Sequence, residues 1–155
     1  CSMTIIRGKI SDLPEINLVI AQAVMAWPMP ERIKRLSVPV LCYDSEDFKH
    51  YQFMLYQQGD SSAGVVVWNA QTLAKTAKGQ GYLMHGLYVA PNCQGRGIGR
   101  QLMQQVFSRA ADAGADGVLV KAERAAIGFF EQCGLEPLPA ISQTDYPYQF
   151  WHKLS

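Results

Sequence analysis

Apolar residues that recur at helical spacing predict four helices along the chain. The first such run, Ile16 to Ala23, follows Asp12 and Glu15, whose side chains are expected to form a capping box at the start of the helix. A glycine ends the last helix, since Gly134 follows Cys133 at a position typical of a C-terminal cap. The helices are expected from residue 12 up to the proline at 28, and at 30–35, 98–113 and 125–133, with a short helix or a turn at 44–50.

Short runs rich in β-branched and aromatic residues predict the strands. Two of them, 51–57 and 63–69, flank the segment Gly59-Asp60-Ser61-Ser62, which is typical of the turn in an antiparallel hairpin. The polar segment 71–81 is expected to be a loop. The other strands are predicted at residues 4–7, 82–89, 118–120, 135–141 and 148–154.

The predicted order of elements, βααβββαβαββ, indicates an α/β (α+β) fold. It fits one mixed, mostly antiparallel sheet of about seven strands with helices on both faces. The 155 residues are expected to form a single domain, 1–155, without repeats or a linker. Cys1 and Ser2 are interpreted as vector-derived residues before a native Met3. A lipid-anchored Cys1 is the alternative interpretation.

Composition narrows the classes of function. The formal net charge of +1 gives no electrostatic reason to expect a nucleic-acid partner or a membrane surface. No apolar run approaches the ~18 residues of a membrane span. The four cysteines form no CxxC pair, and no histidine lies at metal-ligand spacing from them, so no metal is expected and free thiols in the cytoplasm are the favoured interpretation.

A glycine run at a strand-to-helix junction is the strongest chemical signal. It reads Gln94-Gly95-Arg96-Gly97-Ile98-Gly99-Arg100. A helix N-terminus has free N–H groups that attract anions, and glycines allow a ligand to approach the backbone. These features favour a pyrophosphate site, although the spacing fits neither the P-loop nor the dinucleotide fingerprint. The alternative is a turn that only joins a strand to a helix.

Two segments resemble motifs of the GNAT N-acetyltransferase superfamily. Residues 94–99 are similar to its acetyl-CoA-binding motif [QR]-x-x-G-x-[GA]. Residues 126–135, AIGFFEQCGL, are similar to its A-x-x-[FL]-Y-x-x-x-G-F segment. The order of elements also matches that family over nearly the whole chain.

The resemblance implies a cofactor, acetyl-CoA, and a place for it. In that family the acyl thioester lies where two parallel strands splay, here 82–89 and 117–121. The N–H groups of 95–100 would hold the pyrophosphate, and the backbone of the first strand would pair with the pantetheine arm. The residues implied in cofactor binding are Leu87, Tyr88, Val89, Gln94, Gly95, Arg96, Gly97, Ile98, Gly99, Arg100, Phe129 and Phe130.

The reaction implied is attack of a neutral amine on the thioester, which favours a base with a pKa near 7. His85 lies on the implied cleft strand and is the candidate base, with a structural histidine as the alternative. Many family members have a tyrosine that acts as general acid where this chain has Phe130. Another group or solvent would then protonate the thiolate that leaves when the thioester is cleaved, or catalysis is weak. Tyr146 and Tyr148 are candidates for that role.

The acceptor is expected to be a small-molecule amine of unknown identity. In this fold it meets the segment between the first two helices and the last hairpin. The candidate acceptor residues are Trp27, Lys121, Tyr146 and Tyr148, for which surface packing is the alternative. A homodimer is an open option. Two other functions also stay open: a non-catalytic acyl-CoA sensor, favoured by Phe130, and a plain nucleotide- or anion-binding domain.

Overall fold

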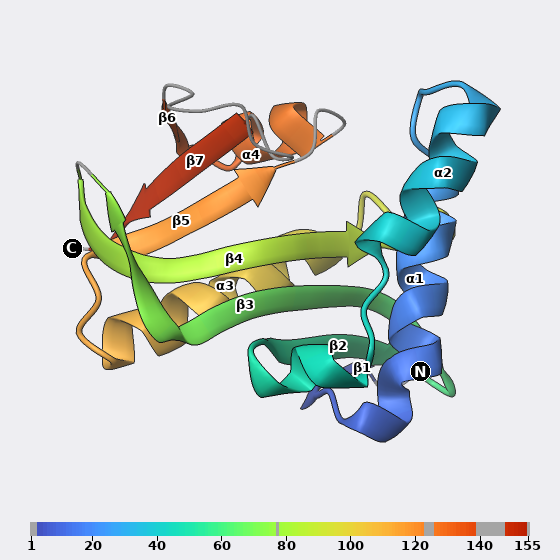
Figure 1. The fold of residues 1–155 in the computed structure, drawn as a ribbon, viewed down its shortest axis with the longest axis horizontal. Coiled ribbons are helices and arrows are strands. Elements are labelled where there is room, and N and C mark those ends of the chain that lie inside the picture. Colours follow the sequence, from blue (N-terminus) through green and yellow to red (C-terminus); the bar gives the residue numbers. More distant parts are fainter. Residues whose placement is uncertain (1–2, 77, 123–125, 139–147, 155) are drawn as a thin grey trace. The chain divides into compact units, whose positions relative to one another are not determined.

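Seven strands form one mixed sheet in the computed structural model, which describes residues 3–76, 78–122, 126–138 and 148–154, with the backbone alone at 3, 70–76 and 148. The strands are β1 (Met3–Arg7), β2 (Gln52–Gln58), β3 (Ser61–Thr76), β4 (Gly79–Val89), β5 (Gly117–Ala122), β6 (Glu136–Leu138) and β7 (Tyr148–Lys153). Their order in the sheet is β1-β2-β3-β4-β5-β7-β6. β5 is parallel to β4 and antiparallel to β7, so the predicted mixed sheet is confirmed (Figure 1).

Four α-helices and three short 3-10 helices complete the described fold. The α-helices are α1 (Leu13–Met25), α2 (Glu31–Leu41), α3 (Ile98–Asp112) and α4 (Ile127–Gln132). The 3-10 helices are η1 (Ile10–Asp12), η2 (Ser45–Lys49) and η3 (Pro91–Cys93). Each α-helix lies where its apolar pattern predicts it, although α2 is longer and α4 shorter than expected.

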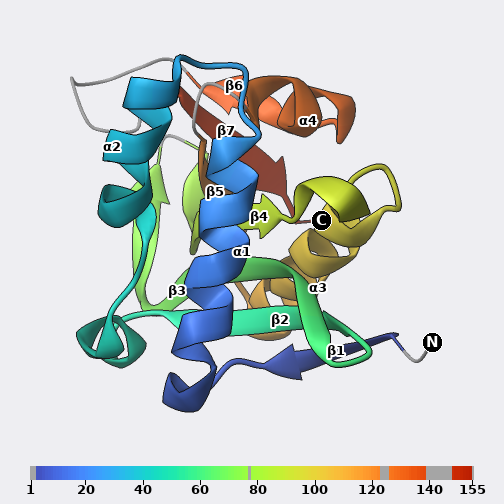
Figure 2. The same cartoon turned by 90° about the vertical axis from the view of Figure 1, so that its right-hand side faces the viewer.

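The chain divides into two compact units. The first comprises Cys1–Val67 and Leu87–Leu102, and the second comprises Trp68–Gly86 and Met103–Ser155. In the first unit, α1 buries one face on the sheet. Its stripe Ile16, Val19, Ile20, Ala23 and Val24 packs with Phe53, Leu55, Val65, Val67 and Tyr88. α1 and α2 lie side by side in both views (Figures 1 and 2).

Close backbone approach shapes the second unit. Gly81 of β4 pairs with Gly117 of β5, and a Cβ on either residue would overlap its surroundings. At Gly117 the overlap would be with the ring of Trp151 and the carbonyl oxygen of His152. Phe130 of α4 packs on Phe150, with ring centroids 5.6 Å apart.

The predicted loop at 71–81 is wrong. β3 runs on to Thr76 and β4 begins at Gly79, so strand occupies most of that segment. Both backbone groups of Gln80 bond to Asp116: the Asp116 N–H donates to the Gln80 carbonyl at 2.8 Å, and the Gln80 N–H donates to the Asp116 side-chain oxygen Oδ2 at 3.0 Å. Backbone pairing of this kind stabilises a strand whatever the polarity of its side chains.

The predicted capping box at Asp12 is also wrong. η1 precedes α1, and the Asp12 carboxylate accepts the Lys9 N–H at 2.8 Å, so it makes no cap bond to α1. Glu15 instead accepts the Ser62 hydroxyl at 2.8 Å. A partner distant in sequence has therefore replaced the local one.

α2 extends beyond the predicted 30–35 and contains Pro39. Proline removes one intrahelical bond, yet the Cys42 N–H still donates to the Val38 carbonyl at 3.0 Å. Pro30, the first residue of the predicted helix 30–35, is the N-cap residue of α2. At the other end of the chain, the predicted strand 135–141 is observed as β6, and residues 139–147 lie outside the described part.

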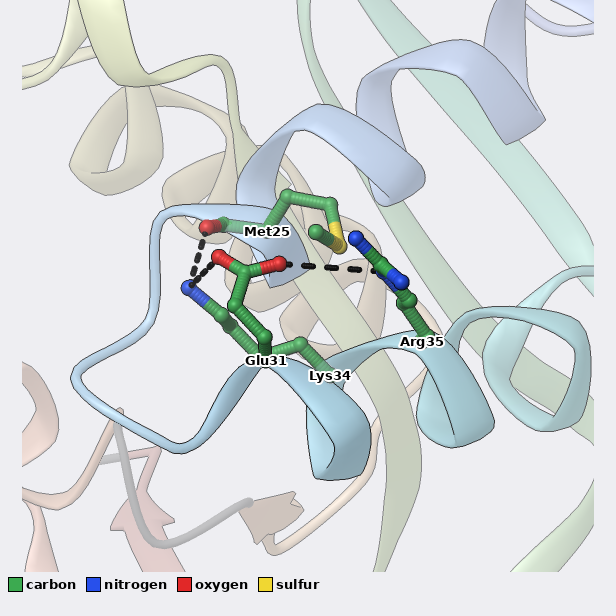
Figure 3. Close-up of polar contacts among 4 residues, drawn as sticks. All are labelled: Met25, Glu31, Lys34 and Arg35. Atoms are coloured by element: carbon green, nitrogen blue, oxygen red, sulfur yellow. Dashed lines mark hydrogen bonds and ion pairs between the residues drawn. The ribbon is translucent and has the colours of Figure 1, made fainter.

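Lys34 is a buried charged residue at the corner between α1 and α2, with 9% of its surface exposed. Its Nζ donates to the Met25 carbonyl at 2.8 Å and lies 3.3 Å from Glu31 Oε1 (Figure 3). Met25 is the last residue of α1, where carbonyls lack intrahelical partners. Lys34 therefore ties the end of α1 to the first turn of α2.

We expect Lys34→Met to lower the free energy of unfolding by about 1–3 kcal/mol, because the Met25 carbonyl loses its buried donor. The measurement is urea unfolding followed by circular dichroism. Lys49→Met is the matched control: Lys49 also pairs with a glutamate three residues earlier, at 3.0 Å, but its side chain is 69% exposed. Exposed pairs contribute little. Equal losses in the two variants would contradict the role assigned to Lys34.

Candidate functional site

The end of a strand, a turn and the start of a helix follow one another in the first unit and carry the glycine run. β4 ends at Val89, η3 covers Pro91–Cys93 and α3 begins at Ile98. Gly95 and Gly97 between them have φ angles of 82° and 78°, in the left-handed region that glycine tolerates best. The Gln101 N–H donates to the carbonyl of Gly97, the residue just before α3, at 3.0 Å. The sequence prediction of a glycine turn before a helix is confirmed.

The turn leaves its backbone open to a ligand. Residues 94–97 are exposed, and a Cβ added at Gly95 or Gly97 would meet nothing within 4 Å. The N–H groups of the first helical turn lack intrahelical acceptors and carry partial positive charge. Arg96 and Arg100 are exposed on either side of the start of α3. This arrangement suits an anion such as a pyrophosphate.

Gly64 in β3 lets the start of α3 approach the sheet. A Cβ at this position would lie 3.0 Å from Leu102 Cδ1, 3.1 Å from Ile98 Cγ2 and 3.2 Å from the Tyr88 carbonyl oxygen. Such contacts are tighter than normal packing allows. Sequence reasoning missed this residue, although a glycine inside a strand is a signal for close approach.

The last part of β4 directs polar backbone groups away from β3. The Ala90 N–H donates to the Ala63 carbonyl of β3 at 2.8 Å. The carbonyl of Val89 belongs to the same trans peptide, so it points in the opposite direction. Leu87, two residues earlier in the strand, has the same orientation. Among the described residues, β4 pairs with β5 through 81–84 and 117–120, and this pairing does not reach Leu87 or Val89.

His85 lies on β4 in the second unit and is partly buried. It follows Met84, which pairs with Val120 of β5, and it has an interaction partner of its own. The other two histidines differ from it. His50 is exposed, whereas His152 stacks on Phe107 with ring centroids 3.7 Å apart. Burial lowers the pKa of His152.

Phe129 and Phe130 lie next to each other on α4 in edge-to-face contact, with ring centroids 5.4 Å apart. Phe130 is 3% exposed and Phe129 is 36% exposed. Lys121 of β5 is partly buried and lies opposite Gln149 of β7. It too has an interaction partner. These residues all belong to the second unit.

Three candidate residues for contact with the acceptor remain: Trp27, Tyr146 and Tyr148. Trp27 follows α1 and packs, partly buried, against the core of the first unit. Its backbone N–H, not that of the indole, donates to the Val24 carbonyl at 3.0 Å. Tyr146 lies outside the described residues. Tyr148 is described as backbone only, paired with Ala122 across β5 and β7. The structure thus brings together Leu87 to Arg100 in one unit and the two phenylalanines in the other.

The sequence matches the model of the Acetyltransferase (GNAT) family over residues 21–135. That segment includes the glycine turn, the start of α3 and the phenylalanine pair. The chain belongs to the GNAT acetyltransferase family. The resemblance inferred from residues 94–99 and 126–135 is therefore confirmed. Among proteins with a curated function, none matches this sequence significantly.

Solved structures of other GNAT proteins share the fold. PaiA N-acetyltransferase from Thermoplasma acidophilum, in complex with coenzyme A, superimposes with a TM-score of 0.77 at 14% identity, covering 99% of this chain and 100% of that one. A GNAT family acetyltransferase from Brucella melitensis, in complex with acetyl-CoA, gives 0.63 at 18%, covering 99% and 89%. The ribosomal-protein-S18-alanine N-acetyltransferase from Escherichia coli gives 0.62 at 17%, covering 99% and 95%. At these identities the likeness shows the GNAT fold.

No helix in the described part of the chain has the length and apolar character needed to cross a membrane. No group of three or more histidine, cysteine, aspartate or glutamate residues in that part could hold a metal ion.

Proposed function

We propose that this GNAT protein is an acetyl-CoA-dependent N-acetyltransferase that acts on a primary amine of a small molecule. The observation that carries the proposal is the exposed turn at 94–97, with its two left-handed glycines, directly before α3. Support also comes from family membership. Two relatives with the same fold were solved with coenzyme A and with acetyl-CoA.

In this proposal the backbone holds the cosubstrate. The N–H groups of 95–100 bind the pyrophosphate, with Arg96 and Arg100 adding positive charge at the edge of the site. The carbonyl and N–H groups of Leu87 and Val89, which face away from β3, pair with the amides of the pantetheine arm as an added strand would. The thioester supplies the activated acetyl group.

The chemistry requires a neutral amine and a proton for the departing thiolate. His85 is proposed as the base that accepts the proton of the amine, directly or through water. Phe130 cannot donate a proton. Its ring is buried against Phe129 and Phe150, so the proposal assigns thiolate protonation to another group or to solvent. Trp27, Lys121, Tyr146 and Tyr148 are the residues proposed to contact the acceptor.

A non-catalytic acyl-CoA sensor is the second candidate function. The observation that favours it is the buried hydrocarbon ring of Phe130, at a position where many family members have a tyrosine. One experiment separates the two functions: coenzyme A release measured against a panel of amines, paired with thermal shifts on addition of acetyl-CoA. Release with any amine supports the enzyme. A thermal shift without release across the panel supports the sensor, and no shift contradicts both.

We expect Phe130→Tyr to leave kcat unchanged or to raise it, because the variant restores a hydroxyl that can act as an acid. General acid catalysis contributes about 10²–10⁴-fold where the geometry is right. The ring is 3% exposed, so a hydroxyl without a partner would also lower stability by about 1–3 kcal/mol. Steady-state kinetics and thermal unfolding measure the two effects. A large loss of kcat with intact acetyl-CoA binding would show that the site requires the phenyl ring.

A further inference from the structure

We infer that the Gln94 side chain competes with the pantetheine arm of coenzyme A for the carbonyl of Val89. The competition lowers the affinity for coenzyme A relative to the affinity for its nucleotide part alone. This inference rests on the proposed function. It starts from one hydrogen bond in the first unit, in which Gln94 Nε2 donates to the Val89 carbonyl at 3.3 Å.

The orientation of the Val89 carbonyl makes it a binding group. Because the Ala90 N–H donates to Ala63 of β3, the Val89 carbonyl of the same peptide faces away from β3. It lies at the end of β4, beyond the residues recorded as paired with β5. An extended ligand that adds to this edge of β4 meets this carbonyl as an acceptor.

Gln94 offers this carbonyl the same kind of donor as the ligand. A pantetheine arm contains two amide N–H groups, and the glutamine side chain ends in an amide NH₂. Gln94 is itself exposed, so its amide can exchange this bond for bonds to water. When a pantetheine N–H replaces it, one amide–carbonyl bond is exchanged for another with little net gain.

The Gln94 side chain is expected to affect the two halves of coenzyme A differently. Gln94 directly precedes Gly95 of the proposed pyrophosphate turn, while its amide reaches back five residues to Val89. The competition therefore affects the pantetheine half of coenzyme A and leaves the nucleotide half unaffected. A variant without the amide should favour ligands that carry the arm.

The test compares two ligands by isothermal titration calorimetry on the full chain. Coenzyme A carries the arm, and 3′-phospho-ADP carries the nucleotide and both 5′-phosphates without it. For Gln94→Met we expect the ratio of the Kd of 3′-phospho-ADP to the Kd of coenzyme A to rise about 2- to 12-fold. This range is the change in Kd that corresponds to the net free energy of one hydrogen bond. Any general effect of the substitution on the turn changes both Kd values equally and cancels in this ratio.

Gln105→Met is the matched control, since Gln105 is exposed on α3, and its ratio should equal that of the wild type. Gln94→Ala should raise the ratio as Gln94→Met does. A ratio that is unchanged or lower in both Gln94 variants overturns the inference while the proposed function stands. A wild-type protein that binds neither ligand overturns the proposed function and the inference with it.

Discussion

Gly97→Val is expected to abolish the stabilisation of the protein by acetyl-CoA. At 100 times its Kd, a ligand that binds the native state stabilises it by about 2.7 kcal/mol, which corresponds to a rise in Tm of about 5–11 °C for a chain of this size. Gly97 has a φ of 78°, which a β-branched residue rarely adopts. The added side chain would also occupy the open space beside the backbone N–H groups.

Gly114→Val provides an unusually close control for Gly97→Val. Gly114 also has a φ of 78° with nothing within 4 Å of an added Cβ, and it lies beyond the other end of α3. Both variants should lose similar stability from backbone strain. Differential scanning fluorimetry with and without acetyl-CoA should show a ligand shift in Gly114→Val alone. A normal shift in folded Gly97→Val would rule out the proposed placement of the pyrophosphate.

Sequence patterns predicted those parts of the fold that depend on local constraints. The helix expected at 98–113 is observed as α3, because its apolar stripe and the glycines before it are both local signals. The segment 71–81 was predicted wrongly because it is polar, whereas its strand structure depends on partners distant in sequence, such as Asp116, whose N–H and side-chain carboxylate both bond to Gln80. The end of α2 was missed for a similar reason, since a proline costs only part of the helical hydrogen bonding and Pro39 is accommodated.

The candidate site follows the same division. The glycine turn could be predicted because left-handed backbone angles are a property of glycine itself. Outside the site, the buried ammonium of Lys34 could not be predicted, since lysine in an exposed helix pattern looks solvated. The bond from Gln94 to Val89 depends on how a chain reversal brings an exposed side chain back to the end of a strand. Neither contact leaves a periodic signal in the sequence.

His85→Ala is expected to lower kcat/KM by roughly 10²-fold while acetyl-CoA still binds, because general base catalysis typically contributes at least this much. The pH profile provides a second and more specific readout. The activity of the wild-type protein should rise with pH as the His85 imidazole loses its proton, because only the neutral ring accepts a proton from the amine. That limb of the profile should flatten in His85→Ala.

His50→Ala is the control for His85→Ala, because His50 is exposed at the end of η2. It should leave both kcat/KM and the pH profile unchanged. His85 is partly buried and has a partner of its own, so thermal unfolding must be measured alongside the kinetics. If His85→Ala lowers the Tm sharply while the folded protein retains its kcat/KM and its pH limb, His85 is structural. Water would then take the proton from the amine, and the proposed base would be wrong.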